Sequence, residues 1–311
     1  MRTATYGLRA LLGCALILLI GATVLPTAAL AQAPPGQDNN PGIGPMKVVQ
    51  VTPNVYFVVG GVGGNNGNSG VIVGAKGVVV IDAKLNSEGA KQLLDEIHKI
   101  TPKPVTDLIF THAHQDHIGG AAAFPSGIEV FAHENAKAEI EKAIATGGRN
   151  APPREAVPNH VVHGSGETLK LQGIRLRLIH VAPAHTTGDL AVWLPDQKTL
   201  FTGDLMATIR KAPLVCKDCT VEGYVQTYKV LTALNAEHVI PGHGFLITNT
   251  ELLERAKYVS DTLSKVKMMV ADGKSLPEIE MSVGDAPEPG PRGMSIPLFS
   301  EICYNEVTHK K

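Results

Sequence analysis

Three histidines and an aspartate fall within six consecutive positions of the segment THAHQDHIGG, residues 111–120. They are His112, His114, Asp116 and His117, and the apolar run VTDLIFT leads directly into them. Because such a run is typical of a buried strand, the four side chains lie on the loop that leaves a strand, where α/β proteins place their chemistry. Neutral imidazole and carboxylate are ligands of zinc, and alternate side chains of this loop can reach two neighbouring ions. The spacing therefore suggests two metal ions.

Three more residues of the same kinds follow other predicted strands. They are His185 in PAHTTGD, Asp204 in FTGDLM and His243 in PGHG, each with a glycine or proline close by. A single histidine at a strand end is usually an ordinary surface or core residue, and Gly-Asp alone is common turn chemistry. The joint pattern is hard to obtain by chance, so the sequence predicts a metal site built from all seven residues.

Together the motifs resemble those of the metallo-β-lactamase superfamily, matched by HAHQDH, His185, Asp204, His243 and, upstream, Asp82 in VVVIDA. The resemblance covers residues 48–271 and implies an α/β fold of the αββα type, a four-layer sandwich. In that fold two mixed β-sheets pack face to face with helices outside, and a dinuclear site lies at one edge. The predicted elements agree, because each half of the chain gives several strands and then helices.

The resemblance also implies roles for the site residues and two zinc ions as cofactors. Carried over position by position, it puts His112, His114 and His185 on the first zinc, Asp116, His117 and His243 on the second, and Asp204 between them. Asp82 is expected to order the ligand loop through hydrogen bonds. The imidazole of His114 favours zinc and hydrolysis, since family members with a di-iron redox centre carry a carboxylate there.

The expected catalytic residues are Asp116 and Asp204. A water held between two zinc ions ionises near neutral pH and attacks a carbonyl carbon, while Asp116 can relay a proton to the departing group. The expected partner is thus a small molecule with a carbonyl to hydrolyse. A metal-binding module without catalytic activity is the alternative class of function.

The substrate stays open at this point. HAHQD followed by GG resembles one subclass of β-lactamases, but Asp204 stands where that subclass has a cysteine, Ala207 where it has a lysine, and His117 is an extra ligand. An aspartate bridge is instead similar to lactonases and to thioester hydrolases of the glyoxalase II kind. We expect β-lactam hydrolysis first, with lactone or thioester hydrolysis as the alternative.

Two further segments are candidates for contact with the substrate. GGVGGNNGNSG, residues 60–70, is either a plain mobile loop or a flap over the site, with Asn66 and Asn68 as candidate contacts. Arg210 and Lys211, just past Asp204, either hold an anionic group or form a solvated basic pair.

The N-terminal 31 residues resemble a secretory signal peptide, because Arg2 and Arg9 precede an apolar run that ends in small residues. An uncleaved membrane anchor is the alternative. Cleavage predicts a periplasmic or secreted protein without stable membrane insertion. After the signal peptide (1–31) we expect a disordered leader (32–46) rich in proline, glycine and asparagine, a catalytic domain (47–275) and a C-terminal tail (276–311).

Composition and cysteine spacing add two expectations. The formal net charge of -1 and a hydrophobic content of 44% suggest a large core and no nucleic-acid partner, and they predict nothing about oligomeric state. Cys216 and Cys219 form C-x-x-C, which in an oxidising compartment predicts a short local disulfide and in a reducing cell a redox or metal motif.

Overall fold

A computed structural model describes residue 1 and residues 44–61, 66–288 and 295–309. The chain divides into residues 1–31 and 32–311, and the fold below is that of the second unit. Residues 2–31 of the predicted signal peptide and residues 32–43 of the predicted leader lie outside the described residues, so both segments stay predictions. The leader boundary at residue 46 is wrong, because the first strand begins at Gly44, where it pairs with Gly61.

The first sheet has seven strands in the order β1-β2-β3-β4-β5-β6-β7. The strands β1 to β4 are antiparallel neighbours, whereas β4 to β7 run parallel. Parallel strands with crossover helices bring their carboxyl ends to the same edge of the sheet. The bounds are β1 Gly44–Thr52, β2 Val55–Gly61, β3 Ser69–Val73, β4 Val78–Ile81, β5 Val105–Ile109, β6 Glu129–His133 and β7 His160–Val162.

The second sheet has five strands in the order β12-β11-β10-β9-β8. Its strands are antiparallel except for β11 and β12, which are parallel and are connected by the helix α4 (Val221–Thr232). The bounds are β8 Gly166–Leu171, β9 Ile174–Ile179, β10 Ala191–Leu194, β11 Thr199–Ala207 and β12 His238–His243. The described residues also form three short 3-10 turns, at Ala121–Ala123, Arg154–Ala156 and Pro195–Gln197.

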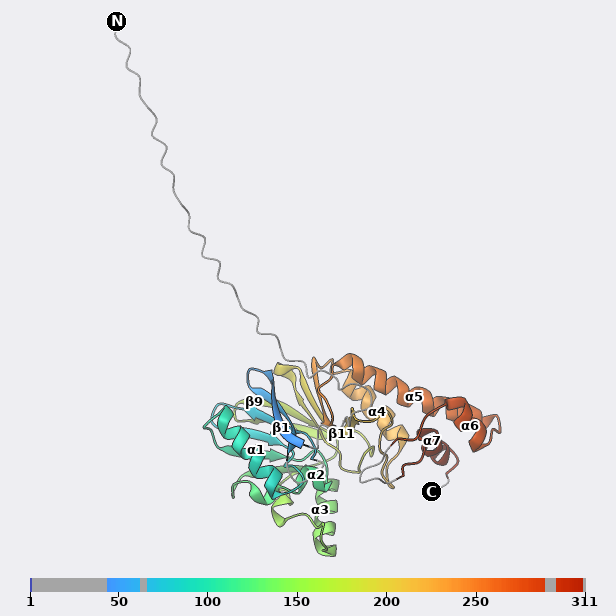
Figure 1. The fold of residues 1–311 in the computed structure, drawn as a ribbon, viewed down its shortest axis with the longest axis horizontal. Coiled ribbons are helices and arrows are strands. Elements are labelled where there is room, and N and C mark those ends of the chain that lie inside the picture. Colours follow the sequence, from blue (N-terminus) through green and yellow to red (C-terminus); the bar gives the residue numbers. More distant parts are fainter. Residues whose placement is uncertain (2–43, 62–65, 289–294, 310–311) are drawn as a thin grey trace. The chain divides into compact units, whose positions relative to one another are not determined.

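Helices cover the outer faces of both sheets (Figure 1). The helices α1 (Ser87–Ile100) and α3 (Glu134–Thr146) pack on the first sheet, and a one-turn helix, α2 (Gln115–Ile118), carries part of the ligand loop. The helices α4 (Val221–Thr232) and α5 (Asn249–Ala271) share a buried cluster with the second sheet. The inner faces meet closely, because a Cβ added to Gly70 on β3 would come within 2.3 Å of the Phe201 ring on β11. The predicted αββα sandwich is therefore confirmed.

Side-chain caps mark the starts of two long helices. The side chain of Asn86 accepts a hydrogen bond from the backbone of Gly89 at 2.9 Å and so caps α1. Thr248 and Glu251 form a capping box at the start of α5.

The C-terminal segment contains more structure than its composition suggested. The helices α6 (Leu276–Val283) and α7 (Phe299–Val307) pack against α5, and Ile279, Phe299 and Cys303 join the core cluster beneath it. A domain boundary at residue 275 therefore divides residues that share one core. None of the helices in the described ranges combines the length and apolar character that crossing a membrane requires.

Candidate metal centre

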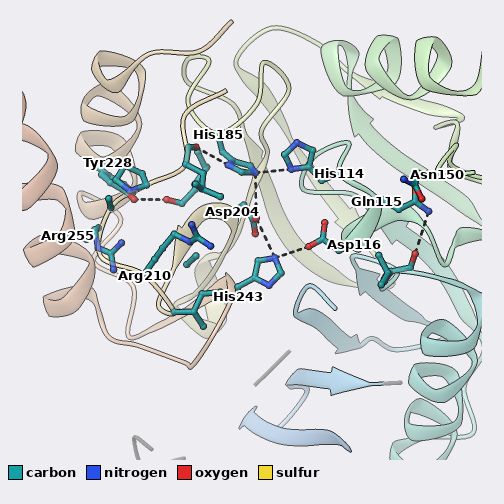
Figure 2. Close-up of a pocket in the computed structure, with 17 residues that line it drawn as sticks. His114, Gln115, Asp116, Asn150, His185, Asp204, Arg210, Tyr228, His243 and Arg255 are labelled. Atoms are coloured by element: carbon teal, nitrogen blue, oxygen red, sulfur yellow. Dashed lines mark hydrogen bonds and ion pairs between the residues drawn. The ribbon is translucent and has the colours of Figure 1, made fainter. Parts of the chain in front are cut away.

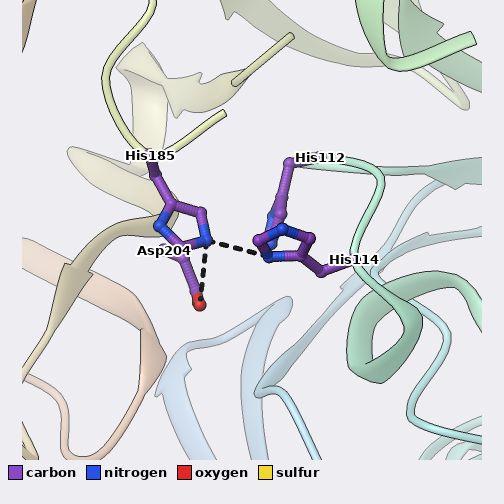
Figure 3. Close-up of side chains that lie close together, drawn as sticks. All are labelled: His112, His114, His185 and Asp204. Atoms are coloured by element: carbon purple, nitrogen blue, oxygen red, sulfur yellow. Dashed lines mark hydrogen bonds and ion pairs between the residues drawn. The ribbon is translucent and has the colours of Figure 1, made fainter. Parts of the chain in front are cut away.

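The seven predicted ligands meet where the two sheets end. The loop after β5 brings four of them, β11 brings Asp204, β12 brings His243, and the loop between β9 and β10 brings His185. Their donor atoms form two groups, and within each group the atoms lie within 4.8 Å of one another: His112, His114, His185 and Asp204 in one, Asp116, His117 and His243 in the other. Figure 3 shows the first group, with His112 and His114 facing His185 and Asp204 from the opposite side.

Asp204 lies between the two groups. Its Oδ2 is 3.5 Å from Nε2 of His185 and 3.5 Å from Nε2 of His243, and its Oδ1 is 3.2 Å from Nε2 of His117. A Cβ at Gly242 would come within 2.0 Å of Oδ1, so a glycine lets β12 approach the carboxylate this closely. One carboxylate thus reaches both groups, as a bridging ligand must.

Hydrogen bonds behind the centre hold the imidazole rings. Oδ2 of Asp82 accepts from the hydroxyl of Thr111 and from Nδ1 of His117, both at 2.7 Å, and Oδ1 accepts from the backbone of Thr111 at 2.8 Å. On the far side, Nδ1 of His185 donates to the carbonyl of Leu214 at 3.0 Å. An imidazole ring that donates its proton from Nδ1 has a lone pair on Nε2, and in His117 and His185 this lone pair is directed at the centre. Asp82 makes the hydrogen bonds expected of it.

Buried polar atoms without a hydrogen-bond partner converge at this point. Among the described residues they include Nε2 of His112, Nε2 of His117 and Oδ1 of Asp204. Such atoms are costly unless a cation or water satisfies them. Imidazole nitrogens and carboxylate oxygens are donors that zinc and related divalent metals accept, so the residues fit a metal centre.

Charges within the cluster shift its pKa values in opposite directions. Burial, reinforced by His117 and His114, holds the pKa of His112 well below its usual range, and burial lowers the pKa of His185 to about 4. Burial alone would raise the pKa of Asp204, but the charges of His243 and His117 outweigh it and hold that pKa well below normal. Burial would lower the pKa of His117 too, but the charges of Asp204 and Asp82 outweigh it and hold that pKa well above its usual range. His112 and His185 thus present neutral imidazole and Asp204 an ionised carboxylate, the forms in which these groups bind metal, whereas His117 gives up a proton when it binds one.

The centre opens into a cavity of about 610 Å³ (Figure 2). Apolar side chains, including Leu85, Ile209 and Leu214, form much of its wall. Two guanidinium groups lie on the same side of the centre, Arg210 on the loop after β11 and Arg255 on α5. Within the described part of the chain neither arginine has a hydrogen bond or ion pair, and Nη1 of Arg210 is buried without a partner. Their positive charge is therefore free to meet a ligand.

Three of the residues predicted to contact the substrate, Asn66, Asn68 and Lys211, do not line the cavity. The side chain of Asn68 is buried and donates to the carbonyls of Pro241 at 2.8 Å and Gly244 at 3.2 Å. Asn66 is buried as well, and its side chain accepts from the backbone of Leu85 at 3.1 Å. Both side-chain amides thus point into the protein, where they make hydrogen bonds with backbone groups around the centre.

Lys211 is absent from the cavity wall, and its Nζ lies 4.4 Å from the centroid of the Tyr258 ring. Only Arg210 of the predicted basic pair lines the wall. Arg255 was missed because a single arginine on an amphipathic helix looks like any other solvated residue.

Cys216 and Cys219 are bridged, in the segment between β11 and α4. That segment borders the cavity and includes Leu214, two residues before the bridge. The carbonyl of Leu214 accepts a hydrogen bond from the hydroxyl of Tyr224 at 2.8 Å and another from His185. The bridge therefore lies beside a residue that orients a predicted ligand.

Comparison with known proteins gives the family. The sequence profile of the metallo-beta-lactamase superfamily matches residues 62–243, more than half of the chain. The subunit beta of 2,4-dinitroanisole O-demethylase from Nocardioides sp. (strain JS1661) is 27% identical over 206 residues, which are 66% of this chain and 62% of that protein. The metallo-beta-lactamase type 2 of Bacillus sp. (strain 170) is 29% identical over 189 residues, or 57% and 66% of the two chains.

Among solved structures, the stereoselective inverting sec-alkylsulfatase Pisa1 from Pseudomonas sp. matches with a TM-score of 0.66 and 18% identity. The match covers 86% of this chain and 51% of that one. The chain thus spans less than two thirds of each of these three proteins. The profile, the relatives and the shared fold lead to one conclusion, that the chain belongs to the metallo-β-lactamase superfamily.

Proposed function

We propose that the protein is an exported hydrolase that uses two zinc ions to open a carbonyl C–N or C–O bond. The observation that carries this proposal is the position of Asp204. Its carboxylate lies within 3.5 Å of a nitrogen in each of the two ligand groups, at the base of a cavity of about 610 Å³. Export rests on the predicted signal peptide.

In this proposal His112, His114 and His185 hold one ion, Asp116, His117 and His243 hold the other, and Asp204 contacts both. When bound, the ions supply an activated water and polarise the carbonyl oxygen of the substrate. Asp116 lines the cavity, with Oδ2 at 3.0 Å from Nε2 of His243. Its carboxylate is placed to take a proton from water and pass it to the departing nitrogen or oxygen.

The wall of the cavity supports β-lactams as the leading substrate class. An apolar surface with two free guanidinium groups suits a compact molecule that carries a carboxylate near the scissile carbonyl. One of the relatives is named as a metallo-beta-lactamase, which is consistent with this choice. Lactones and thioesters are the alternative, because an Asp204 bridge resembles the hydrolases of those substrates.

The test combines metal content with turnover of several substrates. Zinc per chain is measured on the purified protein, and initial rates are measured on a chromogenic cephalosporin, an acyl lactone and a thioester, for the wild type and Asp204→Asn. An alkyl sulfate and a nitroaryl methyl ether are included because two of the similar proteins are named for such substrates. We expect two zinc ions and a cephalosporin rate that falls at least about a hundredfold in the variant.

The other outcomes each exclude part of the proposal. Turnover of only the lactone or the thioester selects the alternative, and turnover of only the sulfate or the ether contradicts carbonyl hydrolysis. Less than one metal ion per chain overturns the ligand assignment. Two ions with no turnover favour a metal-binding module without catalytic activity.

A further inference from the structure

The loop that carries Arg210 is held from behind by the C-terminal segment. One oxygen of Glu288 accepts from the backbone of Lys211 at 2.8 Å, and the other accepts from the backbone of Ala212 at 3.1 Å. A carboxylate that accepts two neighbouring N–H groups fixes the direction of the backbone between them. Glu288 therefore fixes the backbone directly after Arg210.

The direction of this backbone determines which of two neighbouring basic side chains, Arg210 or Lys211, lines the cavity. Arg210 and Lys211 are adjacent, yet Arg210 lines the cavity at the metal centre, whereas Lys211 does not and lies over the Tyr258 ring. A rotation of the peptide between Arg210 and Lys211 would move the guanidinium group out of the cavity or put the lysine side chain in its place. The loop is also held further along, where the carbonyl of Leu214 accepts from His185 at 3.0 Å. Glu288 thus supplies the contact nearest to the arginine.

The electrostatic arrangement leaves the guanidinium of Arg210 available. Both oxygens of Glu288 are engaged with backbone N–H groups, and among the described residues no hydrogen bond or ion pair joins it to Arg210. Burial lowers the pKa of Arg210, and the nearby charges of Glu288 and Asp204 oppose that shift. The negative charge of Glu288 therefore favours the charged form of Arg210, while the N–H donors of the guanidinium group stay free of it.

The direction of the Arg210 side chain matters because a second arginine, Arg255, lies on the same side of the cavity. It reaches the same side of the cavity from α5, a helix of 23 residues whose position is set by core packing (Figure 2). Two guanidinium groups can grip one anionic group only when their donors converge on it. Since Arg210 comes from a loop, its convergence with Arg255 depends on what holds that loop.

We propose that Glu288 is a positioning residue that directs Arg210 toward Arg255, and so gives the site a preference for substrates that carry an anionic group next to the scissile bond. The inference rests on the proposed hydrolase function. It assigns a role in specificity to a segment that lies beyond the residues matched by the family profile, which end at 243.

The test compares Glu288→Gln and Glu288→Ala with the wild type on a chromogenic cephalosporin and on its carboxylate methyl ester. Glutamine keeps one acceptor oxygen and places an NH₂ group against one of the two backbone N–H groups. We expect KM for the anionic substrate to rise roughly fivefold to tenfold in Glu288→Gln, and further in Glu288→Ala, with kcat nearly unchanged. KM for the methyl ester should stay constant. If cephalosporins are not hydrolysed, a carboxylated and an uncarboxylated thioester replace them.

Glu278→Gln is the matched control. Glu278 also accepts two hydrogen bonds from one residue of the C-terminal segment, the backbone and hydroxyl of Ser275 at 2.8 and 2.7 Å, but it does not contact the Arg210 loop. We expect no change in either KM. In an Arg210→Ala background, Glu288→Gln should have no further effect, because the residue through which it acts is gone. Equal KM changes for both substrates, or the same effect from Glu278→Gln, would overturn the inference.

A second readout separates this inference from the proposed function. Phenylglyoxal modifies accessible arginines, so the rate of labelling at Arg210 in the metal-loaded protein can be followed by mass spectrometry without turnover. We expect Glu288→Ala to change this rate at least about twofold while labelling of Arg175, an exposed arginine paired with Asp196, stays constant. Unchanged labelling at Arg210 contradicts the inference even if no substrate is hydrolysed, whereas absence of turnover with altered labelling contradicts only the hydrolase proposal.

Discussion

The ring of His117 donates through Nδ1 to Oδ2 of Asp82 over 2.7 Å, and both side chains are buried. The same carboxylate accepts from the hydroxyl and the backbone of Thr111. This arrangement fixes the tautomer of His117 and the path of the ligand loop together, because the donor, the acceptor and the loop backbone share one anchor.

Replacing this anchor should weaken metal binding. In Asp82→Asn the amide offers one acceptor oxygen where the carboxylate offers two, so His117 and Thr111 compete for it. We expect the affinity for zinc to fall about tenfold to a hundredfold. Titration against a chromophoric chelator measures the change.

Asp107→Asn is the control for this experiment. Asp107 is a buried acid on β5 that accepts from Thr106 at 2.7 Å and Gln172 at 3.0 Å, outside the metal cluster. Its replacement should alter stability and leave the zinc affinity within about twofold of the wild type. A similar loss of affinity in both variants would show that Asp82 acts only through general stability.

Removal of metal should lower stability, because partnerless buried atoms of His112, His117 and Asp204 are then left without a cation. Free zinc at a hundred times its Kd stabilises a folded protein by about 2.7 kcal/mol. We therefore expect Tm to fall by several degrees on chelation and to recover on adding zinc. Asp204→Asn should show a much smaller difference between the two conditions, and an equal difference would argue against the ligand assignment.

Lys84 makes the stability of the metal-free protein depend on pH. Its ammonium group is fully buried and donates to the carbonyls of Val58 and Gly67, both at 3.0 Å. Burial lowers its pKa to about 7, against a weaker opposing effect of Asp82. Above pH 7 the unfolded chain, with a lysine pKa near 10.4, binds a proton that the folded chain has released. This group therefore makes the free energy of unfolding rise with pH by about 1.4 kcal/mol per unit between pH 7 and 10.

Lys84→Met isolates that contribution. The variant loses two hydrogen bonds at every pH, but it also loses the titrating group. Urea denaturation of the chelated proteins at pH 7, 8 and 9 should show the wild type gaining stability relative to the variant as pH rises. Parallel pH profiles for the two proteins would contradict a lowered lysine pKa.

Arg255 should affect the binding of anionic substrates more than catalysis. We expect Arg255→Ala to raise KM for a carboxylated substrate about tenfold, and Arg255→Lys to recover part of the loss, because lysine keeps the charge but not the planar pair of donors. Arg175→Ala is the control, because Arg175 is an exposed arginine that forms an ion pair with Asp196 and does not line the cavity. If added salt raises KM equally in the wild type and Arg255→Ala, the arginine does not act through its charge.

The ligand cluster could be predicted because its information is local. His112 to His117 follow the largely buried strand β5, and the carboxyl ends of parallel strands lie at one edge of their sheet. Asn66 and Asn68 could not be predicted in the same way, since a polar residue in a glycine-rich segment looks the same whether it faces solvent or satisfies buried carbonyls.

The C-terminal segment escaped sequence analysis for a different reason. Its prolines and glycines hide two short helices whose burial depends on α5, so the relevant signal is tertiary packing instead of periodicity. Glu288 and Arg255 lie far in sequence from the motifs they approach, and nothing local marks either one.

The ligands come from both sheets, with the His112 loop on the first and Asp204 and His243 on the second. Once metal ions are bound, the sheets cannot separate without losing them, so opening of the interior to proteases and release of metal are coupled. We therefore expect the zinc supply around the protein to set its lifetime as well as its activity.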